Sequence, residues 1–239
     1  MRARSSADKQ DDQKGSSRTF TEAARRAQIV GAAIEVIAEV GYTKATFTRI
    51  AKQAGLSSTG MISYHFAGKD DLMREVVAEV FRVADGYMVP RIEAQPTGAG
   101  RLRAYIESNI ELIGEFPKHL PAAVEVLANL RGEDDSMREF CAAMDSLVDM
   151  HTHLIRESQK AGEFGEFDPR VMALAIRGAI DSVVTRAAKD PDFDAVACGR
   201  ELADLFDRAT RKDTRKDTRK DTRKDTRKDT RQDTGKDNR

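Results

Sequence analysis

Tryptophan is absent from this sequence, and cysteine occurs only twice. Cys141 and Cys198 stand in no CxxC or other ligand spacing, so neither a disulfide framework nor a cysteine-rich metal site is expected. Two free thiols in a reducing cytosol are the simplest interpretation. Long apolar runs are also absent, since none approaches the roughly 18 residues that a membrane span requires. The first twenty residues lack the apolar stretch of a secretory signal. We therefore expect no membrane partner and a cytoplasmic protein.

Catalytic motifs are missing as well. The chain contains no HExxH, P-loop, GxSxG or GxGxxG. His151 and His153 form an H-x-H, but two such positions on a helix are about 200° apart, so they cannot easily share a metal ion. We therefore expect no enzyme, no cofactor and no metal site.

Helical periodicity is the main pattern that is present, because alternating β-branched runs are absent and Ala, Leu, Arg, Glu and Met dominate. Five apolar residues from Ile29 to Val40 share one face of a helix, and Gly41 follows at the expected stop. The pattern predicts an all-α fold of about nine helices. A long helix is expected from Lys69, with Pro90 and Pro96 marking its end, and later helices at about 101–116, 122–130, 134–161, 169–189 and 193–209.

Charge is segregated along the chain although the formal net charge is zero. Residues 1–69 carry 11 Lys and Arg against 6 Asp and Glu, a net charge of +5. Residues 70–210 carry 16 against 27, a net charge of −11, and residues 211–239 carry 13 against 7, a net charge of +6. A basic N-terminal module on an acidic body indicates a polyanionic partner at that end.

The stretch KQAGLSSTGMISYHFAGKDDL, from Lys52 to Leu72, combines glycines, small hydroxyls and an aromatic triplet. Thr46 is placed to cap a short helix that Gly55 ends, and Ser57 to cap a second one that runs to about Tyr64. Two short helices joined by a tight turn form a helix-turn-helix. The short side chains allow the second helix to enter a DNA major groove, where hydroxyls reach base edges and phosphates. An ordinary helical hairpin with a polar outer face is the alternative.

Residues 46–72, TFTRIAKQAGLSSTGMISYHFAGKDDL, resemble the tetracycline-repressor (TetR) family of bacterial regulators. The resemblance is specific over residues 20–72 and beyond them extends only to architecture and length. It implies a homodimer in which an N-terminal three-helix domain binds double-stranded DNA and the remaining helices bind a small ligand and dimerise. The family commonly reads G-V-S-x-G-T-L-Y-x-H-F, and here the segment from Gly55 to Phe66 is one residue longer. Ser63 then stands where the family has a phosphate-contacting Tyr, so either Tyr64 takes over that contact or Ser63 makes a shorter one.

The resemblance also implies which residues meet DNA. Lys69 is expected on a phosphate at a helix N-terminus, and Thr59 is expected to point to base edges. Three of these residues have an alternative to DNA contact. His65 could serve only in packing, Arg49 could be a solvated surface charge, and Thr46 could act only as a helix cap. The full set of expected DNA-binding residues is Thr46, Arg49, Lys52, Ser57, Ser58, Thr59, Gly60, Ser63, Tyr64, His65 and Lys69.

A ligand cavity within residues 70–188 is a further implication of the resemblance. Its candidate lining residues are large or adaptable side chains, each with core packing as its alternative, and one polar pair: Leu112, Phe116, Leu127, Phe140, Met144, Leu147, His151, Arg177 and Asp181. Arg177 and Asp181 either pair with each other, meet a partner subunit or face the cavity. By analogy the last two helices form the dimer surface, with Ala173, Ile176, Gly178, Ala179, Ile180 and Val183 as the expected packing residues.

Four segments follow from these patterns: a disordered lead (1–18), a helix-turn-helix domain (19–69), a ligand-binding and dimerisation domain (70–209) and a disordered tail (210–239). The tail repeats Arg-Lys-Asp-Thr and holds no apolar residue to bury. It is either a cationic arm that adds non-specific DNA affinity or an expanded nucleotide repeat that the protein tolerates.

Taken together, the patterns and the resemblance predict a ligand-responsive repressor that binds a palindromic operator as a dimer and is released by an unknown small molecule. The two recognition helices would lie about 34–36 Å apart. The protein would be associated with the bacterial nucleoid when DNA-bound. Two alternatives stay open: a ligand-independent activator or architectural DNA-binding protein of the same fold, and a helical enzyme whose helix-turn-helix is vestigial.

Overall fold

The computed structural model describes residues 6–129, 135–190 and 192–212. These residues form nine helices and no strand beyond an isolated bridge between Phe164 and Arg211, so the all-α prediction is confirmed. None of the described helices is sufficiently long and apolar to cross a lipid bilayer. The helices are α1 (Ser6–Val40), α2 (Phe47–Gln53), α3 (Gly60–His65), α4 (Lys69–Glu93), α5 (Gly98–Glu115), α6 (His119–Asn129), α7 (Asp135–Lys160), α8 (Pro169–Lys189) and α9 (Ala195–Thr210).

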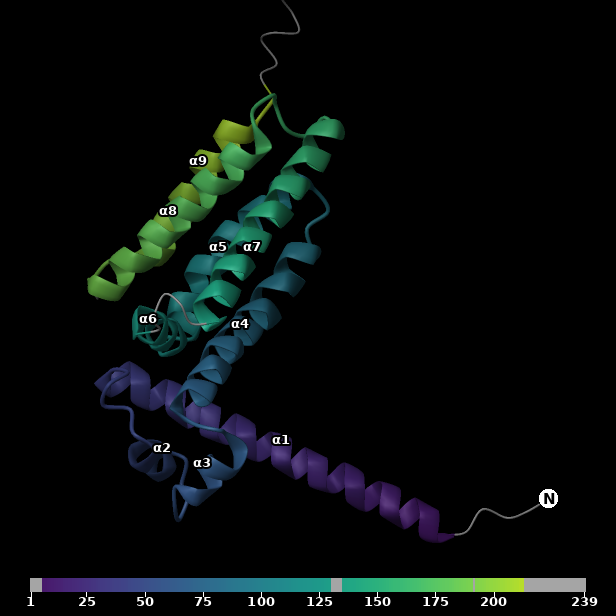
Figure 1. Cartoon of the computed structure of the whole chain (residues 1–239). Helices are drawn as coiled ribbons and strands as arrows, with labels where there is room; N and C mark the ends of the chain where they lie inside the picture. Colours follow the sequence, from purple (N-terminus) through teal and green to yellow (C-terminus); the bar gives the residue numbers. More distant parts are fainter. Residues whose placement is uncertain (1–5, 130–134, 191, 213–239) are drawn as a thin grey trace, which may run out of the picture.

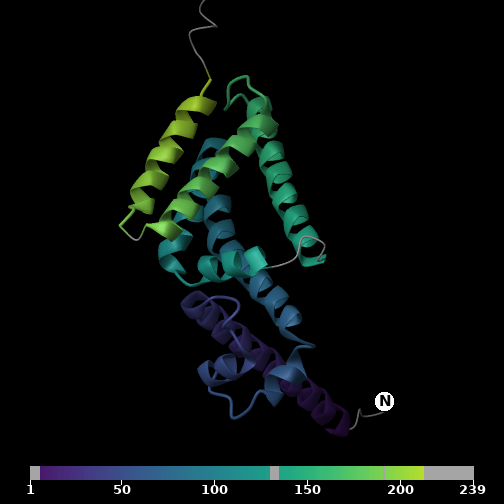
Figure 2. The same ribbon diagram turned by 60° about the vertical axis from the view of Figure 1, so that its left-hand side comes forward.

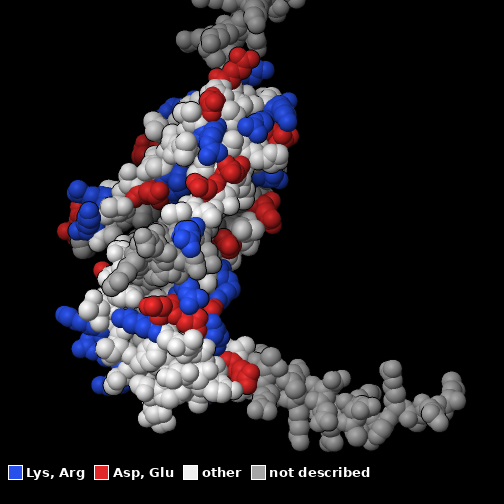
Figure 3. All heavy atoms as spheres, viewed as in Figure 1, with Lys and Arg blue, Asp and Glu red and all other residues white. Residues whose placement is uncertain are grey.

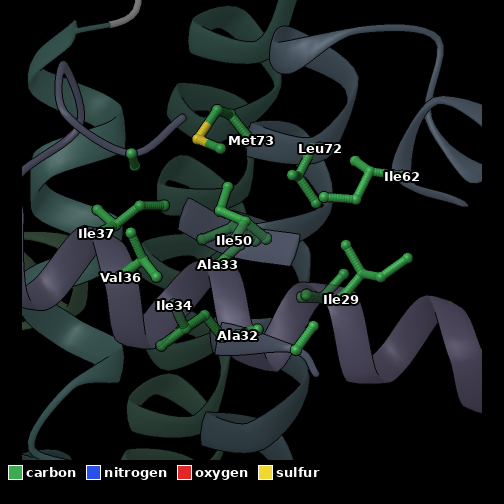
Figure 4. Packing of buried hydrophobic residues seen from close by; sticks show 14 of the residues in the cluster. Ile29, Ala32, Ala33, Ile34, Val36, Ile37, Ile50, Ile62, Leu72 and Met73 are labelled. Carbon is green, nitrogen blue, oxygen red and sulfur yellow. The ribbon is translucent and has the colours of Figure 1, made fainter. Parts of the chain in front are cut away.

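The first three helices and the start of α4 share one apolar core. α1 lies across the base of the molecule, with α2 and α3 below it and α4 rising from it (Figure 1). Figure 4 shows Ile29 of α1, Ile50 of α2, Ile62 of α3 and Leu72 of α4 around a common interior, and all four are fully buried. Burial of such side chains contributes roughly 1.5–3 kcal/mol each. The core extends to Val76, past the domain boundary predicted after residue 69.

The helix ends of this module follow the local chemistry. Gly41 and Gly55 have φ angles of +79° and +67°, a left-handed conformation that glycine adopts without steric cost. The hydroxyl of Thr46 accepts a hydrogen bond from the backbone N–H of Arg49 at 3.4 Å, which confirms its predicted role as N-cap of α2.

The start of α3 differs from the prediction. The predicted cap at Ser57 is wrong, because α3 begins at Gly60 and its N-cap residue is Thr59. Thr59 has α-region backbone angles (φ −73°, ψ −14°) and makes no side-chain cap hydrogen bond. A capping hydroxyl usually requires an extended backbone at that position, so the extra residue in this loop has removed the usual geometry.

The ends of α4 and α1 compare differently with the predictions. α4 ends at Glu93, between the two prolines that were predicted to mark its end, and the Pro90 carbonyl in its last turn accepts from the N–H of Ala94 at 3.1 Å. The backbone is helical from Ser6, where a disordered lead was predicted for residues 1–18. Extending a helix that already exists avoids the cost of nucleation. The tail predicted for 210–239 lies, after residue 212, outside the described residues.

The remaining helices form a second body above the first. α8 and α9 lie side by side in both views, and α7 and α8 diverge from the loop that joins them (Figures 1 and 2). Their core centres on fully or almost fully buried isoleucines, including Ile106 of α5, Ile155 of α7 and Ile180 of α8.

The predicted dimer residues on α8 are only partly right. Ala173, Ile176, Ile180 and Val183 are buried within their own chain, because their spacing of three or four residues places them on one face, against α5 and α7. Gly178 is exposed and Ala179 is half-buried. The face of α8 turned to solvent instead carries Val171 and Leu174, which are 64% and 51% exposed.

α6 belongs to both bodies. Ala122 and Val126 on one face are part of the N-terminal core. Lys118, just before the helix, donates to the Glu39 carboxylate of α1 at 2.9 Å. Glu125 accepts from the backbone N–H of Tyr42 at 3.1 Å, next to the end of α1. α6 is therefore in direct contact with α1 and with the turn that follows it.

Candidate functional site

The surface of α3 and of the loop before it is small, polar and exposed. Ser57, Ser58, Gly60 and Ser63 are exposed, and Thr59 is half-buried. Tyr64 stands out, with 70% of its surface accessible. The structure thus brings the predicted recognition residues together on one short helix and its leading loop, at the lower edge of the molecule in Figure 1.

Cations flank this surface. Arg49 and Lys52 are exposed on α2, as is Lys44 in the turn that leads to α2. Figure 3 shows Lys and Arg side chains gathered along one edge of the lower module. Lys44 was not predicted, although the basic run YTKATFTR would have drawn attention to it. Positive charge beside an exposed helix of small residues is the footprint of a nucleic-acid-binding surface.

Arg26 of α1 holds the C-terminal end of α3 and was also missed. It donates to the backbone carbonyl of His65 at 2.8 Å and to the Glu75 carboxylate at 2.6 Å. Its guanidinium carbon lies 4.4 Å from the ring centroid of Phe66. The His65 ring is half-buried and meets the Tyr64 ring edge-to-face, with 5.0 Å between centroids. Arg26 therefore fixes the orientation of α3 relative to α1 and α4.

Lys69 is held within the protein. Its Nζ donates to the Tyr42 carbonyl at 2.7 Å and lies 4.0 Å from the centroid of the Tyr42 ring. Burial lowers the pKa of Lys69. An ammonium carries three donors, so two N–H groups are left for a phosphate.

A cavity of about 330 Å³ lies between α4, α5, α6, α7 and α8. This volume is at the lower end of the roughly 300–1,000 Å³ typical of small-molecule sites. Most of the predicted residues line it: Leu112, Phe116, Leu127, Met144, Leu147, Arg177 and Asp181. His151 is buried outside the lining, and the side chain of Phe140 is not among those that the structure describes.

Several lining residues were not predicted although a pattern marks them. Tyr105 and Asn109 precede the predicted Leu112 on α5 at intervals of four and three residues, which is one helix face. Val80, Ala84 and Met88 of α4 are likewise four residues apart, and Leu120 and Ala123 of α6 precede the predicted Leu127 at intervals of three and four. His119 also lines the cavity, and burial lowers its pKa.

The polar pair on α8 is the main charged feature of this apolar cavity. Arg177 forms an ion pair with Asp181, one helical turn later. Arg177 Nη1 also donates to the Tyr105 hydroxyl at 3.3 Å and to Asn109 Oδ1 at 3.5 Å. Two of the three alternatives stated for Arg177 and Asp181 are therefore both true: the two side chains pair with each other, and both line the cavity of their own chain.

His151 supports this group from behind the lining. Its ring lies 3.7 Å from the ring of Tyr105, centroid to centroid, and its Nδ1 is 2.7 Å from the Leu147 carbonyl. Because a carbonyl only accepts, Nδ1 carries the proton. Burial lowers the pKa of His151 and raises that of Tyr105, so the imidazole is neutral and the phenol protonated near neutral pH.

Comparisons with known proteins agree on one family. The profile described as "Bacterial regulatory proteins, tetR family" matches residues 29–76, from the middle of α1 into α4. The fatty acid metabolism regulator protein of Bacillus subtilis is 28% identical over 180 residues, which cover 74% of this chain and 91% of that protein. The crystal structure of FadR from Bacillus subtilis in complex with stearoyl-CoA is 25% identical, with a TM-score of 0.64, and covers 75% of this chain and 96% of that chain. AibR, solved with isovaleryl coenzyme A and operator DNA, shares the fold at 21% identity and a TM-score of 0.60, over 77% of this chain and 96% of that one. Residues 29–76 thus match the tetR family of bacterial regulatory proteins, and most of the chain is similar to a fatty acid metabolism regulator.

Proposed function

We propose that this protein is a transcriptional repressor that binds a palindromic operator as a homodimer and is released from it by a small molecule in the cavity. One observation carries the proposal: α6 packs on α1 with one face and lines the cavity with the other. α6 thus joins the N-terminal module to the candidate effector site, as α4 also does. The similarity to the fatty acid metabolism regulator protein of Bacillus subtilis over most of the chain supports regulation rather than catalysis.

DNA binding is supported by the exposed surface of α3 and its cationic flank. In a dimer two such helices would enter successive major grooves about 34–36 Å apart. Exposed apolar side chains on α8 and α9 offer the dimer surface: Val171 and Leu174 on α8 and Leu205 on α9, which is 52% exposed. Contiguous apolar surface of this kind marks an interface more often than free solvent. The protein would then act in the cytoplasm, on the nucleoid.

The proposed effector carries an acyl chain. The FadR structure holds stearoyl-CoA and the AibR structure isovaleryl coenzyme A. The walls that α4, α5, α6 and α7 contribute here are mainly apolar, which suits a hydrocarbon chain. A bound acyl ligand lowers the affinity for DNA if it favours a dimer whose α3 helices are at the wrong separation. The loss of DNA affinity cannot exceed the difference between the ligand's affinities for the two arrangements of the dimer.

The test is selection of bound sequences from a random DNA pool with the full-length chain. We expect one palindrome to be enriched, and Tyr64→Ala to abolish the enrichment while the folded protein is retained. Tyr87→Ala, at a residue of α4 away from the recognition surface, serves as a matched control and should select the same palindrome. Enrichment of no sequence by the unaltered chain would contradict the proposal.

A further inference from the structure

The guanidinium of Arg177 is incompletely satisfied at the wall of the cavity. Its Nε is buried and has no hydrogen-bond partner among the described residues. The two contacts from Nη1, to Tyr105 at 3.3 Å and to Asn109 at 3.5 Å, are longer than the usual 2.9–3.0 Å. Because Arg177 lines the cavity and its donors are incompletely used, an acceptor brought against the guanidinium can form a hydrogen bond that the protein alone does not make.

The Tyr105 hydroxyl adds a second donor at the same place. It accepts from Arg177, and within the described part of the chain it donates to no other group. Burial holds its pKa above the ordinary value, so the proton stays on the oxygen. Stacking against His151 fixes the ring. Arg177 of α8 and Tyr105 of α5 thus place two donor groups side by side in the lining.

The charge of this group is already balanced. Asp181 pairs with Arg177 and also lines the cavity. A ligand carboxylate that reached Arg177 would also approach the Asp181 carboxylate, and the like charges would repel, although solvent screens Asp181, whose side chain is 60% exposed. A neutral acceptor can use the spare donors without disturbing the ion pair.

We propose that the cavity binds an acyl group through its neutral carbonyl oxygen, which accepts from Arg177 and Tyr105, while the hydrocarbon chain lies against the apolar walls of α4, α6 and α7. The ligand is an ester or thioester rather than the free acid. The inference deepens the proposed function and depends on the cavity being the effector site.

The experiment compares octanoyl-CoA, methyl octanoate and octanoate as ligands of the full-length chain by isothermal titration calorimetry. The thioester and the ester should bind at least about tenfold more tightly than the acid, the factor expected from one hydrogen bond to a charged donor. Tighter binding of both the thioester and the methyl ester than of the acid supports the carbonyl site. Any difference between the thioester and the methyl ester shows whether the coenzyme portion adds contacts. Octanoate binding as tightly as the esters, or no binding by any of the three probes, overturns the inference.

Variants of the polar residues test whether hydrogen bonding and charge, rather than the shape of the cavity, decide which ligand binds. Arg177→Met and Tyr105→Phe should each weaken methyl octanoate several-fold or more and leave octanoate little changed. Asp181→Asn removes the repelling charge at constant size, so it should raise the affinity for octanoate about tenfold. Arg186→Met is the control, because Arg186 forms the same i, i+4 pair with an Asp on the exposed part of α8 and does not line the cavity. If Asp181→Asn does not favour octanoate, the inference is wrong.

Measuring release of operator DNA distinguishes a failure of the proposed effector role from a failure of the proposed carbonyl site. Esters that bind in the predicted order but leave the protein on DNA contradict the effector role and support the carbonyl site. Octanoate that releases DNA as well as the esters do overturns the carbonyl site and leaves the effector role intact.

Discussion

Replacing Arg26 by Ala should loosen α3 more than any other single change of a half-exposed residue in the N-terminal module. Arg26 joins three helices, because it donates to the His65 carbonyl at the end of α3, pairs with Glu75 of α4 and covers the Phe66 ring. Truncation leaves the His65 carbonyl without this donor and uncovers an aromatic face.

The cost follows from these contacts. A hydrogen bond from a charged donor contributes roughly 1.5–3 kcal/mol. The pair with Glu75 contributes about 0–1 kcal/mol, since the two side chains are 38% and 28% exposed. The stacking on Phe66 contributes about 0.5–1 kcal/mol. Because contacts that share one side chain are not additive, we expect a total loss of roughly 2–4 kcal/mol.

Urea unfolding gives the global loss, and hydrogen exchange at the α3 amides gives the local one. If α3 opens locally, a loss of this size accelerates exchange roughly 30- to 700-fold. Arg25→Ala is the matched control, because Arg25 is the adjacent residue of α1 and bonds only Gln28 on its own helix. Equal stability and equal exchange in the two variants would refute the assignment of Arg26 as the residue that fixes α3.

Three further predictions concern other parts of the chain. Gly98→Ala should cost roughly 1–3 kcal/mol by overpacking, because the new Cβ would lie 2.7 Å from Ser158 Cβ. Gly114→Ala, on the same helix with open space around it, should be neutral or slightly stabilising in the same urea titration, because alanine has the higher helix propensity. His151 has a lowered pKa when folded, so the unfolded chain binds its proton first and stability should fall as pH drops below about 6.5; His151→Phe should flatten that dependence in thermal unfolding between about pH 7 and pH 5. Tyr64→Phe should weaken binding to all DNA sequences about equally, measured by anisotropy, if its hydroxyl contacts a phosphate, and a changed sequence preference would contradict that role.

Apolar periodicity made much of this fold predictable. The face from Ile29 to Val40 and the glycines at 41 and 55 depend on local spacing, and the structure places them as expected. The cap at Ser57 failed, because one inserted residue changes a backbone conformation that spacing alone does not reveal. The dimer residues on α8 failed in part, because periodicity identifies an apolar face but not whether that face meets its own chain or a partner.

Part of the cavity lining was predicted as well, including Arg177 and Asp181, but their partners Tyr105 and Asn109 were not. Large apolar residues on inward faces line the cavity as the periodicity indicates. The meeting of Tyr105 with Arg177, 72 positions apart, depends on how α5 packs against α8. The engagement of Lys69 with Tyr42 likewise joins residues 27 positions apart. Contacts between residues so far apart in the sequence cannot be predicted without knowing how the helices pack.

The most direct test of the account is the affinity of the full-length chain for its selected palindrome, measured by fluorescence anisotropy without octanoyl-CoA and with octanoyl-CoA at a concentration near its dissociation constant for the unaltered protein. We predict tight, sequence-specific binding that the ligand weakens in the unaltered protein and in Arg186→Met, and weakens much less in Arg177→Met. Two results would contradict the claim that this cavity controls binding to DNA. In one, the ligand leaves the affinity for DNA unchanged; in the other, the ligand weakens DNA binding by Arg177→Met as much as it weakens DNA binding by the unaltered protein.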